Sequence, residues 1–138
     1  MNLHLLIDRL TVSIFSYANK EIKIVNNINP FLQAEAREEI LNNLLSNLLG
    51  QATFHAKSKH IRISSRAFHN VILMNIKYKD PRPVYDLEKD LSEVKNQAEM
   101  LGGCLYFAKN KINGTNISLT FINHQISASV PNWNAKLN

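Results

Sequence analysis

Helical and strand-like patterns follow one another along nearly the whole chain, and their order limits the folds that the chain can adopt. Helices are predicted over residues 3–19, 33–55 and 86–101, and strands over 21–26, 60–65, 71–79, 104–109 and 117–122. This order of helix, strand, helix, two strands, helix and two strands fits a mixed sheet with helices packed on one face. We therefore predict the α+β class and, within it, a two-layer α/β sandwich.

The segment 33–55 has the clearest helical pattern. Glu35, Glu38 and Glu39 crowd its predicted first turns, where negative charge interacts favourably with the helix dipole. Gly50 lies inside the helix and costs about 1 kcal/mol relative to alanine, so it either permits close packing or marks a local distortion. A wide apolar stripe follows one face of the helix and consists of Leu41, Leu44, Leu45, Leu48, Leu49 and Ala52.

Turn and breaker residues separate the later elements. Pro81 and Pro83 end the strand over 71–79, because proline can join neither a strand ladder nor a helix interior. The pair Gly102-Gly103 is predicted to cap the third helix, and Asn113-Gly114 to form the turn between the last two strands. One face of the strand over 71–79 is apolar and carries Ile72, Met74, Ile76 and Tyr78.

The composition is that of one globular domain. The chain has 138 residues, of which 45% are hydrophobic and 20% charged, so it can bury a core of its own. No run of about 18 apolar residues occurs, and no basic segment precedes the apolar start, so we expect neither membrane contact nor a signal peptide. The single cysteine, Cys104, cannot form an internal disulfide and fits a reducing, cytoplasmic location.

The charge and the metal-binding residue types point to no further partner by themselves. The formal net charge of +5 could favour nucleic acid, an acidic protein or a nucleotide. The cations are spread along the chain, however, and no nucleic-acid reading motif accompanies them, so no nucleic-acid partner is predicted. One cysteine is too few for the usual structural zinc sets, and no Cys/His spacing resembles a zinc site, so no metal ligands are assigned.

Two stretches resemble the sequence boxes of bacterial histidine kinase ATPase domains, the GHKL or Bergerat-fold family. Residues 47–63, NLLGQATFHAKSKHIRI, resemble the N-box, especially the subgroup that reads N-A-L-K-H-A-K-A-S-x-I-x-I. Residues 101–105, LGGCL, and 114–119, GTNISL, resemble the L-G-G-x-L and G-T-x-h-x-h ending of the same domains. The resemblance covers roughly residues 3–122. We therefore assign 1–122 to a domain of this kind and 123–138 to a C-terminal tail.

The resemblance implies a site for ATP and Mg²⁺ on one face of the sandwich, under a flexible lid. Gln51 stands where the family's N-box asparagine helps to hold magnesium and phosphates, and Asn47 matches an asparagine often found one turn earlier. Asp80 follows its strand where the family has the aspartate that accepts a hydrogen bond from the adenine amino group. Thr115 lies in the final box, which is near the adenine in the family. These four are the candidate binding residues. The alternatives are polar residues beside a core helix for Gln51 and Asn47, and a turn-forming aspartate before proline for Asp80.

Several family positions have changed in this chain. The glycines of the family's D-x-G-x-G box are replaced by Arg82 and Val84, which removes permissive backbone residues. The two lid glycines correspond to Glu88 and Asp90, and carboxylates at these positions would repel triphosphate oxygens. Glutamine at position 51 shifts the amide oxygen, although magnesium demands near-ideal geometry. No catalytic residue is therefore assigned, and ATP and Mg²⁺ are expected as ligands only if this altered site still binds them.

These changes lead to a leading functional hypothesis and two alternatives. The leading hypothesis is a degenerate histidine kinase-type domain that acts in signalling through a protein partner, either a kinase dimerisation domain or a response regulator. The first alternative is a genuine ATP-binding domain of a two-component sensor kinase that phosphorylates a histidine elsewhere. The second is a domain that binds a purine through the adenine side alone.

Overall fold

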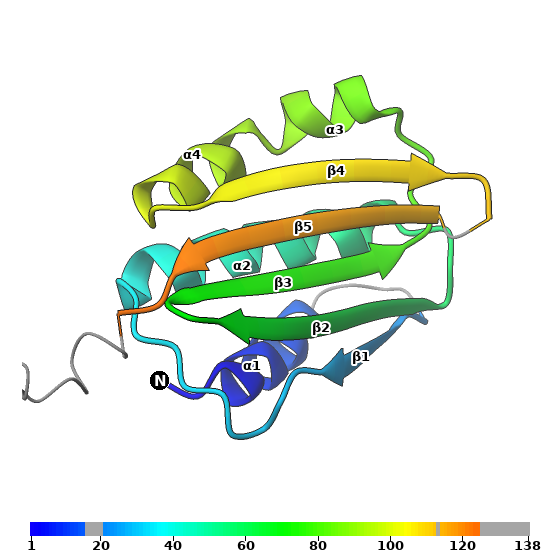
Figure 1. The fold of residues 1–138 in the computed structure, drawn as a ribbon. Coiled ribbons are helices and arrows are strands. Elements are labelled where there is room, and N and C mark those ends of the chain that lie inside the picture. The colour runs from blue at the N-terminus through cyan, green and yellow to red at the C-terminus, as the bar shows by residue number, and fades with distance from the viewer. Residues whose placement is uncertain (16–20, 113, 125–138) are drawn as a thin grey trace, which may run out of the picture.

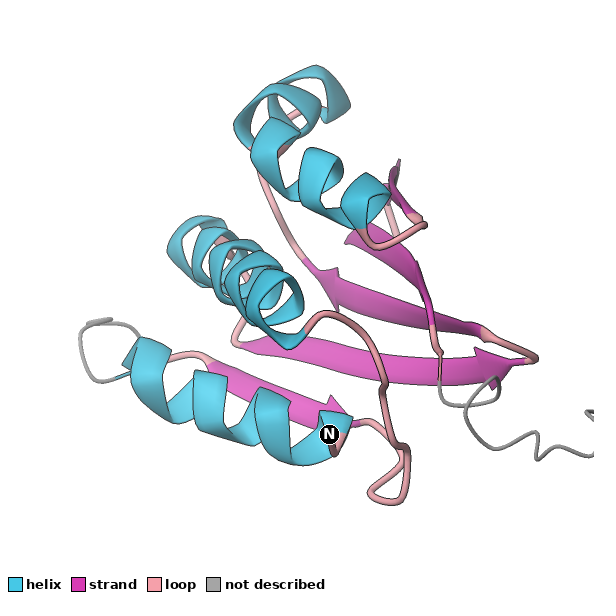
Figure 2. Cartoon of the chain, turned by 90° about the vertical axis from the view of Figure 1, so that its left-hand side faces the viewer, coloured by secondary structure: helices cyan, strands magenta, loops and turns pink. Residues whose placement is uncertain are grey.

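Five strands form a single mixed sheet, and helices cover only one of its faces (Figures 1 and 2). The architecture is seen in a computed structural model, which describes residues 1–15, 21–112 and 114–124. The predicted α/β sandwich is confirmed. In chain order the elements are α1 (Leu3–Phe15), β1 (Lys23–Asn27), α2 (Glu38–His55), β2 (His60–Phe68), β3 (Val71–Tyr78), α3 (Val84–Asp90), α4 (Ser92–Met100), β4 (Cys104–Asn110) and β5 (Gly114–Ile122).

The strands are arranged in the order β1-β2-β3-β5-β4 across the sheet. The pair β1 and β2 is parallel, and the other neighbouring strands are antiparallel. Successive side chains point to opposite faces of a strand, so every second residue of β5 is buried towards the helices. The helix α2 contacts α1 on one side and α4 on the other. Its predicted apolar stripe is buried throughout, and the core therefore lies between the helices and one face of the sheet.

The helix α2 begins at Glu38, whereas the sequence pattern predicted a start near Gln33. Tertiary hydrogen bonds hold the intervening backbone in another conformation. Gln33 forms an isolated antiparallel bridge with Asn2, and the amide of Glu35 donates to Oδ1 of Asn123 at 2.8 Å. The carbonyl of Glu35 also accepts a hydrogen bond from the amide of His124, at 2.8 Å, so it does not accept from the amide four residues later, as a helix would require. Glu35 consequently lies outside the helix.

The third predicted helix is divided in two, and it also starts earlier than expected, at Val84. The backbone leaves helical geometry at Leu91, which has φ −107° and ψ 23°. Two tertiary contacts hold the chain at this point: the side chain of Leu91 is buried in the core, and the preceding Asp90 is bound by Arg82. The predicted cap is confirmed: Gly102 has a φ of 78°, and the amide of Gly103 donates to the carbonyl of Ala98 in a Schellman-type closure.

Two strands are longer than predicted, and some predicted positions lie outside the described residues. The strand β2 extends to Phe68 rather than 65, and β5 begins at Gly114, which has a φ of 81°, rather than at 117. Asn113, the other half of the predicted turn, lies outside the described residues, as do positions 16–19 of the first predicted helix and 125–138 of the predicted tail. Asn123, where that tail begins, is buried. Among the described residues no helix combines the length and apolar character needed to cross a bilayer.

Gly50 has no packing role that would require glycine. A Cβ atom built at this position in α2 meets nothing within 4 Å, so the interpretation that Gly50 permits close packing is wrong. We expect Gly50→Ala to raise the free energy of unfolding by up to about 1 kcal/mol, because alanine loses less backbone entropy in a helix. Urea denaturation followed by circular dichroism measures this change. A destabilised variant would contradict the open surroundings of Gly50.

Candidate functional site

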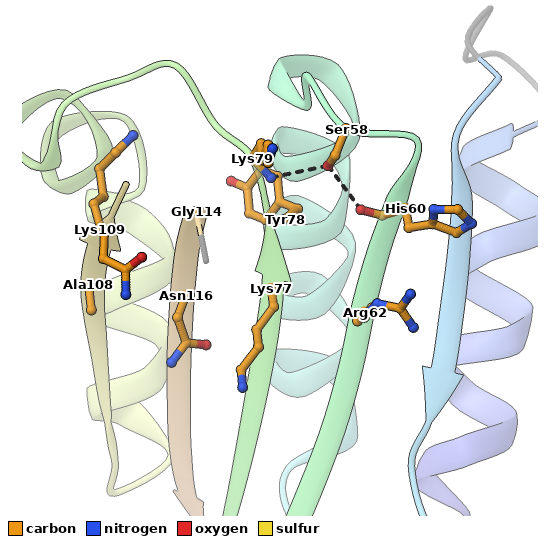
Figure 3. Close-up of a pocket in the computed structure, with 11 residues that line it drawn as sticks. Ser58, His60, Arg62, Lys77, Tyr78, Lys79, Ala108, Lys109, Gly114 and Asn116 are labelled. Atoms are coloured by element: carbon orange, nitrogen blue, oxygen red, sulfur yellow. Dashed lines mark hydrogen bonds between the residues drawn. The ribbon is translucent and has the colours of Figure 1, made fainter. Parts of the chain in front are cut away.

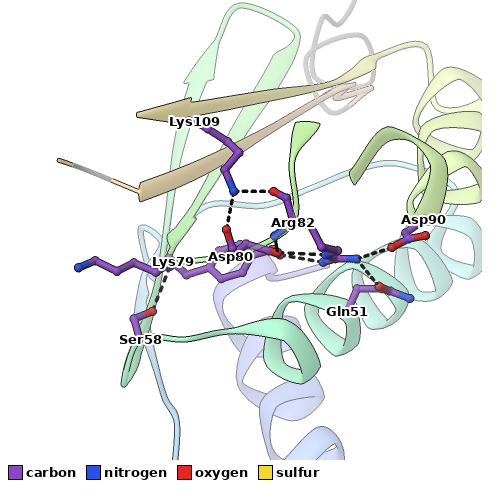
Figure 4. Close-up of polar contacts among 8 residues, drawn as sticks. Gln51, Ser58, Lys79, Asp80, Arg82, Asp90 and Lys109 are labelled. Atoms are coloured by element: carbon purple, nitrogen blue, oxygen red, sulfur yellow. Dashed lines mark hydrogen bonds and ion pairs between the residues drawn. The ribbon is translucent and has the colours of Figure 1, made fainter. Parts of the chain in front are cut away.

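A cluster of buried polar side chains lies where β3 ends and the chain crosses to α3, above the C-terminal half of α2 (Figure 4). The two prolines at positions 81 and 83 lie in this crossing and keep the segment out of regular structure. Asp80 and Arg82 are its central residues, with 6% and 8% of their surface exposed. Charged residues are seldom buried to this extent unless they are paired. The pairing of these two residues therefore decides what the site can bind.

The carboxylate of Asp80 accepts four hydrogen bonds. The guanidinium of Arg82 binds it in a bidentate manner, with Nε 3.0 Å from Oδ1 and Nη2 2.7 Å from Oδ2. The backbone amide of Arg82 also donates to Oδ1, at 2.9 Å, and the hydroxyl of Tyr78 donates to Oδ2, at 2.5 Å. A carboxylate has about four lone-pair sites. All of the acceptor capacity of Asp80 is therefore used within the chain.

The remaining nitrogen of the Arg82 guanidinium connects two helices. Its Nη1 donates to Oε1 of Gln51 on α2, at 2.9 Å, and to Oδ2 of Asp90 at the end of α3, at 3.1 Å. On the other side, Nζ of Lys109 on β4 donates to the backbone carbonyls of Asp80 and Arg82. One arginine thus links the end of β3 with α2 and α3, and Lys109 fixes the crossing segment to the neighbouring strand.

The charges in the cluster stabilise one another. Burial by itself raises the pKa of Asp80, but the hydrogen bonds from Arg82 and Tyr78 outweigh it and hold this pKa below its ordinary value. Burial lowers the pKa of Arg82, and its contacts with Asp80 and Asp90 more than reverse that effect. The pKa of Tyr78 is raised, first by burial and then by its hydrogen bond to Asp80. Asp80 and Arg82 are therefore both ionised at neutral pH, and Tyr78 is protonated.

The structure brings some of the predicted site residues together and not others. Asp80 and Gln51 meet through Arg82, although no hydrogen bond joins them directly. Thr115 is buried beside them, because β5 pairs it with Tyr78, and its Oγ1 has no hydrogen-bond partner among the described residues. Asn47 is half-buried one turn before Gln51 and takes no part in the cluster.

The two acids that replace lid glycines differ in their surroundings. Glu88 is exposed on α3, and in the described part of the chain no hydrogen bond or ion pair joins it to the cluster, whereas the side chain of Asp90 is 40% exposed and paired with Arg82. Sequence reasoning treated Arg82 only as a lost glycine and assigned no role to Tyr78 or Lys109. A signal for Arg82 was present, because an arginine two residues after an aspartate, between two prolines, is placed to fold back onto that carboxylate.

Comparison with solved structures identifies the fold. The ATP-binding domain of PrrB from Mycobacterium tuberculosis matches with a TM-score of 0.71 at 14% identity, over 89% of this chain and 95% of that one. The catalytic domain of histidine kinase ThkA matches with a TM-score of 0.75 at 19% identity, over 89% and 94% of the two chains. The chain has the fold of a histidine kinase ATP-binding domain.

In two longer histidine kinases, only part of the chain matches this fold. The histidine kinase AdeS of Acinetobacter baumannii matches with a TM-score of 0.76 at 12% identity, and the chain spans 66% of that protein's chain. A blue-light activated histidine kinase of Erythrobacter litoralis matches with a TM-score of 0.72 at 15% identity, and the chain spans 44% of it. No family model and no curated protein matches the sequence itself. The kinase fold is therefore recognisable here from the tertiary structure.

Proposed function

We propose that the chain is a degenerate histidine kinase-type ATP-binding domain that acts in cytoplasmic signal transduction through contact with another protein, with little or no phosphoryl transfer. The occupied carboxylate of Asp80 carries this proposal. An adenine amino group could bind Asp80 only by displacing Arg82 or Tyr78, and displacement of Arg82 would leave a buried carboxylate without its cation. Arg82 therefore competes with a nucleotide for the same acceptor.

The residues of the site do not fit ATP and magnesium. The amide oxygen of Gln51, the candidate magnesium ligand, already accepts a hydrogen bond from Arg82. Asp90 adds a carboxylate beside it, on the side where the resemblance would place the triphosphate. The guanidinium of Arg82 is held by three polar side chains, and a magnesium ion would have to displace it from them. Magnesium gives up its bound water reluctantly, so this exchange is unfavourable.

Exposed aromatic side chains support a role in protein contact. Phe54 on α2 and Tyr85 on α3 have 72% and 74% of their surface exposed, and they belong to the two helices that Arg82 connects. Aromatic residues are enriched in the cores of protein interfaces. A partner such as a kinase dimerisation domain or a response regulator would cover these rings, while the Arg82 cluster would keep the two helices in fixed positions.

Chemical-shift mapping tests this proposal. We expect millimolar adenosine or Mg-ATP to leave the amide resonances of Gln51, Asp80 and Thr115 unchanged, since Asp80 has no free acceptor. Addition of an unlabelled dimerisation domain or response regulator from the same organism should instead shift resonances of α2 and α3. Saturable shifts of Asp80 and Thr115 with Mg-ATP, without any response to either protein, would overturn the proposal.

One observation favours the alternative of a genuine ATP-binding domain. Oγ1 of Thr115 is buried without a hydrogen-bond partner among the described residues, and a buried unsatisfied hydroxyl next to the candidate adenine reader is what a missing ligand would leave. In that case Mg-ATP should bind with micromolar affinity, and Asp80→Asn should weaken the binding. A response to adenosine that equals or exceeds the response to Mg-ATP would point to the adenine side alone.

A further inference from the structure

The face of the sheet that the helices leave uncovered is basic. None of the 11 acidic residues of the chain lies in a strand. Basic residues occupy positions of β1, β2 and β3 that alternate with apolar residues facing the helices, and they therefore point away from the core. These exposed residues are Lys23, His60, Arg62, Arg66 and Lys77. The sheet thus gathers cations that are far apart in the sequence.

A depression of about 740 Å³ lies at one end of this face, where β2 and β5 begin and β3 and β4 end (Figure 3). Arg62, Lys77 and Lys79 line it, together with the amide of Asn116. Ser58 orders its rim, because its hydroxyl donates to the carbonyl of His60 at 3.0 Å and accepts from the amide of Lys79 at 3.1 Å. The volume lies within the range of small-molecule sites.

The cations of the depression are not neutralised. Arg62 and Lys77 are direct partners in the antiparallel register of β2 and β3. Like charges in that arrangement destabilise a sheet. In the described part of the chain, the ion pairs involve none of the three cations Arg62, Lys77 and Lys79. The fold therefore tolerates a repulsion that an anionic ligand between Arg62 and Lys77 would relieve.

We propose that this depression binds a small ligand with several phosphate groups, such as an oligophosphate. Arginine and lysine together supply the charge-assisted donors that phosphate oxygens accept, and Asn116 adds a neutral donor. The cations converge on one concave end of the sheet, and this arrangement favours a compact ligand over an extended polymer. Tyr78 and Lys109 also line the depression, but their polar side-chain atoms bind Asp80 and the crossing segment. The site formed by Arg62, Lys77 and Lys79 on the open face is therefore additional to the one discussed above.

Titration with inorganic tripolyphosphate at low ionic strength tests the site. We expect saturable binding, with amide shifts on β2, β3 and the start of β5, that weakens as salt is added. Lys77→Glu should weaken the binding about tenfold or more, because it replaces a phosphate donor with a carboxylate. The matched control is Lys95→Glu, which makes the same charge change on the exposed side of α4 and should leave the affinity within about twofold.

The same variant separates ligand binding from folding. Lys77→Glu places a carboxylate opposite Arg62, so we expect its melting temperature to rise by about 1–4 °C while the affinity for tripolyphosphate falls. Absence of tripolyphosphate binding would overturn the proposal. Equal losses of affinity in Lys77→Glu and Lys95→Glu would also overturn it, because binding would then depend on net charge alone. Tight binding of a single-stranded oligonucleotide without binding of tripolyphosphate would also overturn it, in favour of an extended nucleic-acid surface.

Discussion

Replacement of Arg82 by methionine is expected to lower the free energy of unfolding by about 3–5 kcal/mol near neutral pH, the usual cost of breaking a buried ion pair by removing one partner. The side chains of Asp80 and Arg82 are only 0% and 8% exposed, so water cannot readily take over the lost hydrogen bonds. A loss of this size is a large part of the stability of an ordinary domain. Urea denaturation near neutral pH measures it.

The pH dependence of this loss has a defined sign. In the unmodified chain the pKa of Asp80 is held below its ordinary value of 3.8, so its stabilising contribution is complete above that value and is lost as the pH falls through the folded-state pKa. Without the Arg82 side chain, burial should raise the pKa of Asp80 above 3.8. In this variant Asp80 then binds a proton more readily in the folded state than in the unfolded state. The difference in stability between the two proteins should therefore shrink as the pH is lowered from about 7 towards 4.

The double variant Asp80→Leu with Arg82→Met is the control. Apolar replacement of both partners of a buried pair is often neutral or stabilising, so the double variant should recover most of the loss caused by Arg82→Met. The result also bears on function. If Arg82→Met costs less than about 1 kcal/mol, as exposed ion pairs do, then Arg82 does not hold Asp80 in solution, and the main argument against nucleotide binding fails.

Replacement of Gly103 by alanine is expected to destabilise the fold by at least about 3 kcal/mol, because a new methyl group would overlap backbone that cannot move away. A Cβ at Gly103 would lie 1.7 Å from the carbonyl oxygen of Thr120 and 2.8 Å from Cα of Phe121. Relief of this overlap would separate β4 from β5 or break the closure at the end of α4. Urea denaturation or the loss of a cooperative thermal transition would report the effect.

The neighbouring glycine is the matched control for this prediction. Gly102 needs its positive φ of 78°, but a Cβ there would meet mainly the side chain of Ile122, at 2.6 Å, and a side chain can rotate away. Gly102→Ala should therefore cost about 1–2 kcal/mol, the price of the left-handed conformation for a residue with a Cβ atom. If Gly103→Ala costs no more than Gly102→Ala, the close approach of Gly103 to β5 is not essential to the fold.

The sequence was informative wherever a feature depends on neighbours along the chain. The apolar stripe of α2, the alternation in β3 and the glycine cap after α4 each arise from residues a few positions apart, and each was predictable. The order of these elements then led to the sandwich. Boundaries that depend on distant partners were missed, such as the start of α2, where Gln33 lies opposite Asn2 in an isolated bridge and the amide of Glu35 donates to Asn123.

The candidate site shows the same division between local and long-range information. Asp80 and Gln51 were predicted as site residues from their resemblance to family boxes, and the structure places them around one guanidinium. Nothing in the local pattern indicates that Arg82 also reaches Gln51 on α2, because that contact joins residues 31 positions apart in the sequence. The identity of the residues came from the sequence, and their mutual contacts came from the fold.

The sequence by itself determined the elements, their order and which positions departed from the histidine kinase boxes, since these depend on residue type and short-range spacing. Only the tertiary structure decided that Arg82 occupies the carboxylate of Asp80, and that cations scattered along the chain converge on one end of the open sheet face. The physical reason is that hydrogen bonding and electrostatic repulsion act through space. Strand register places Arg62 opposite Lys77, and helix packing places Gln51 beside Arg82.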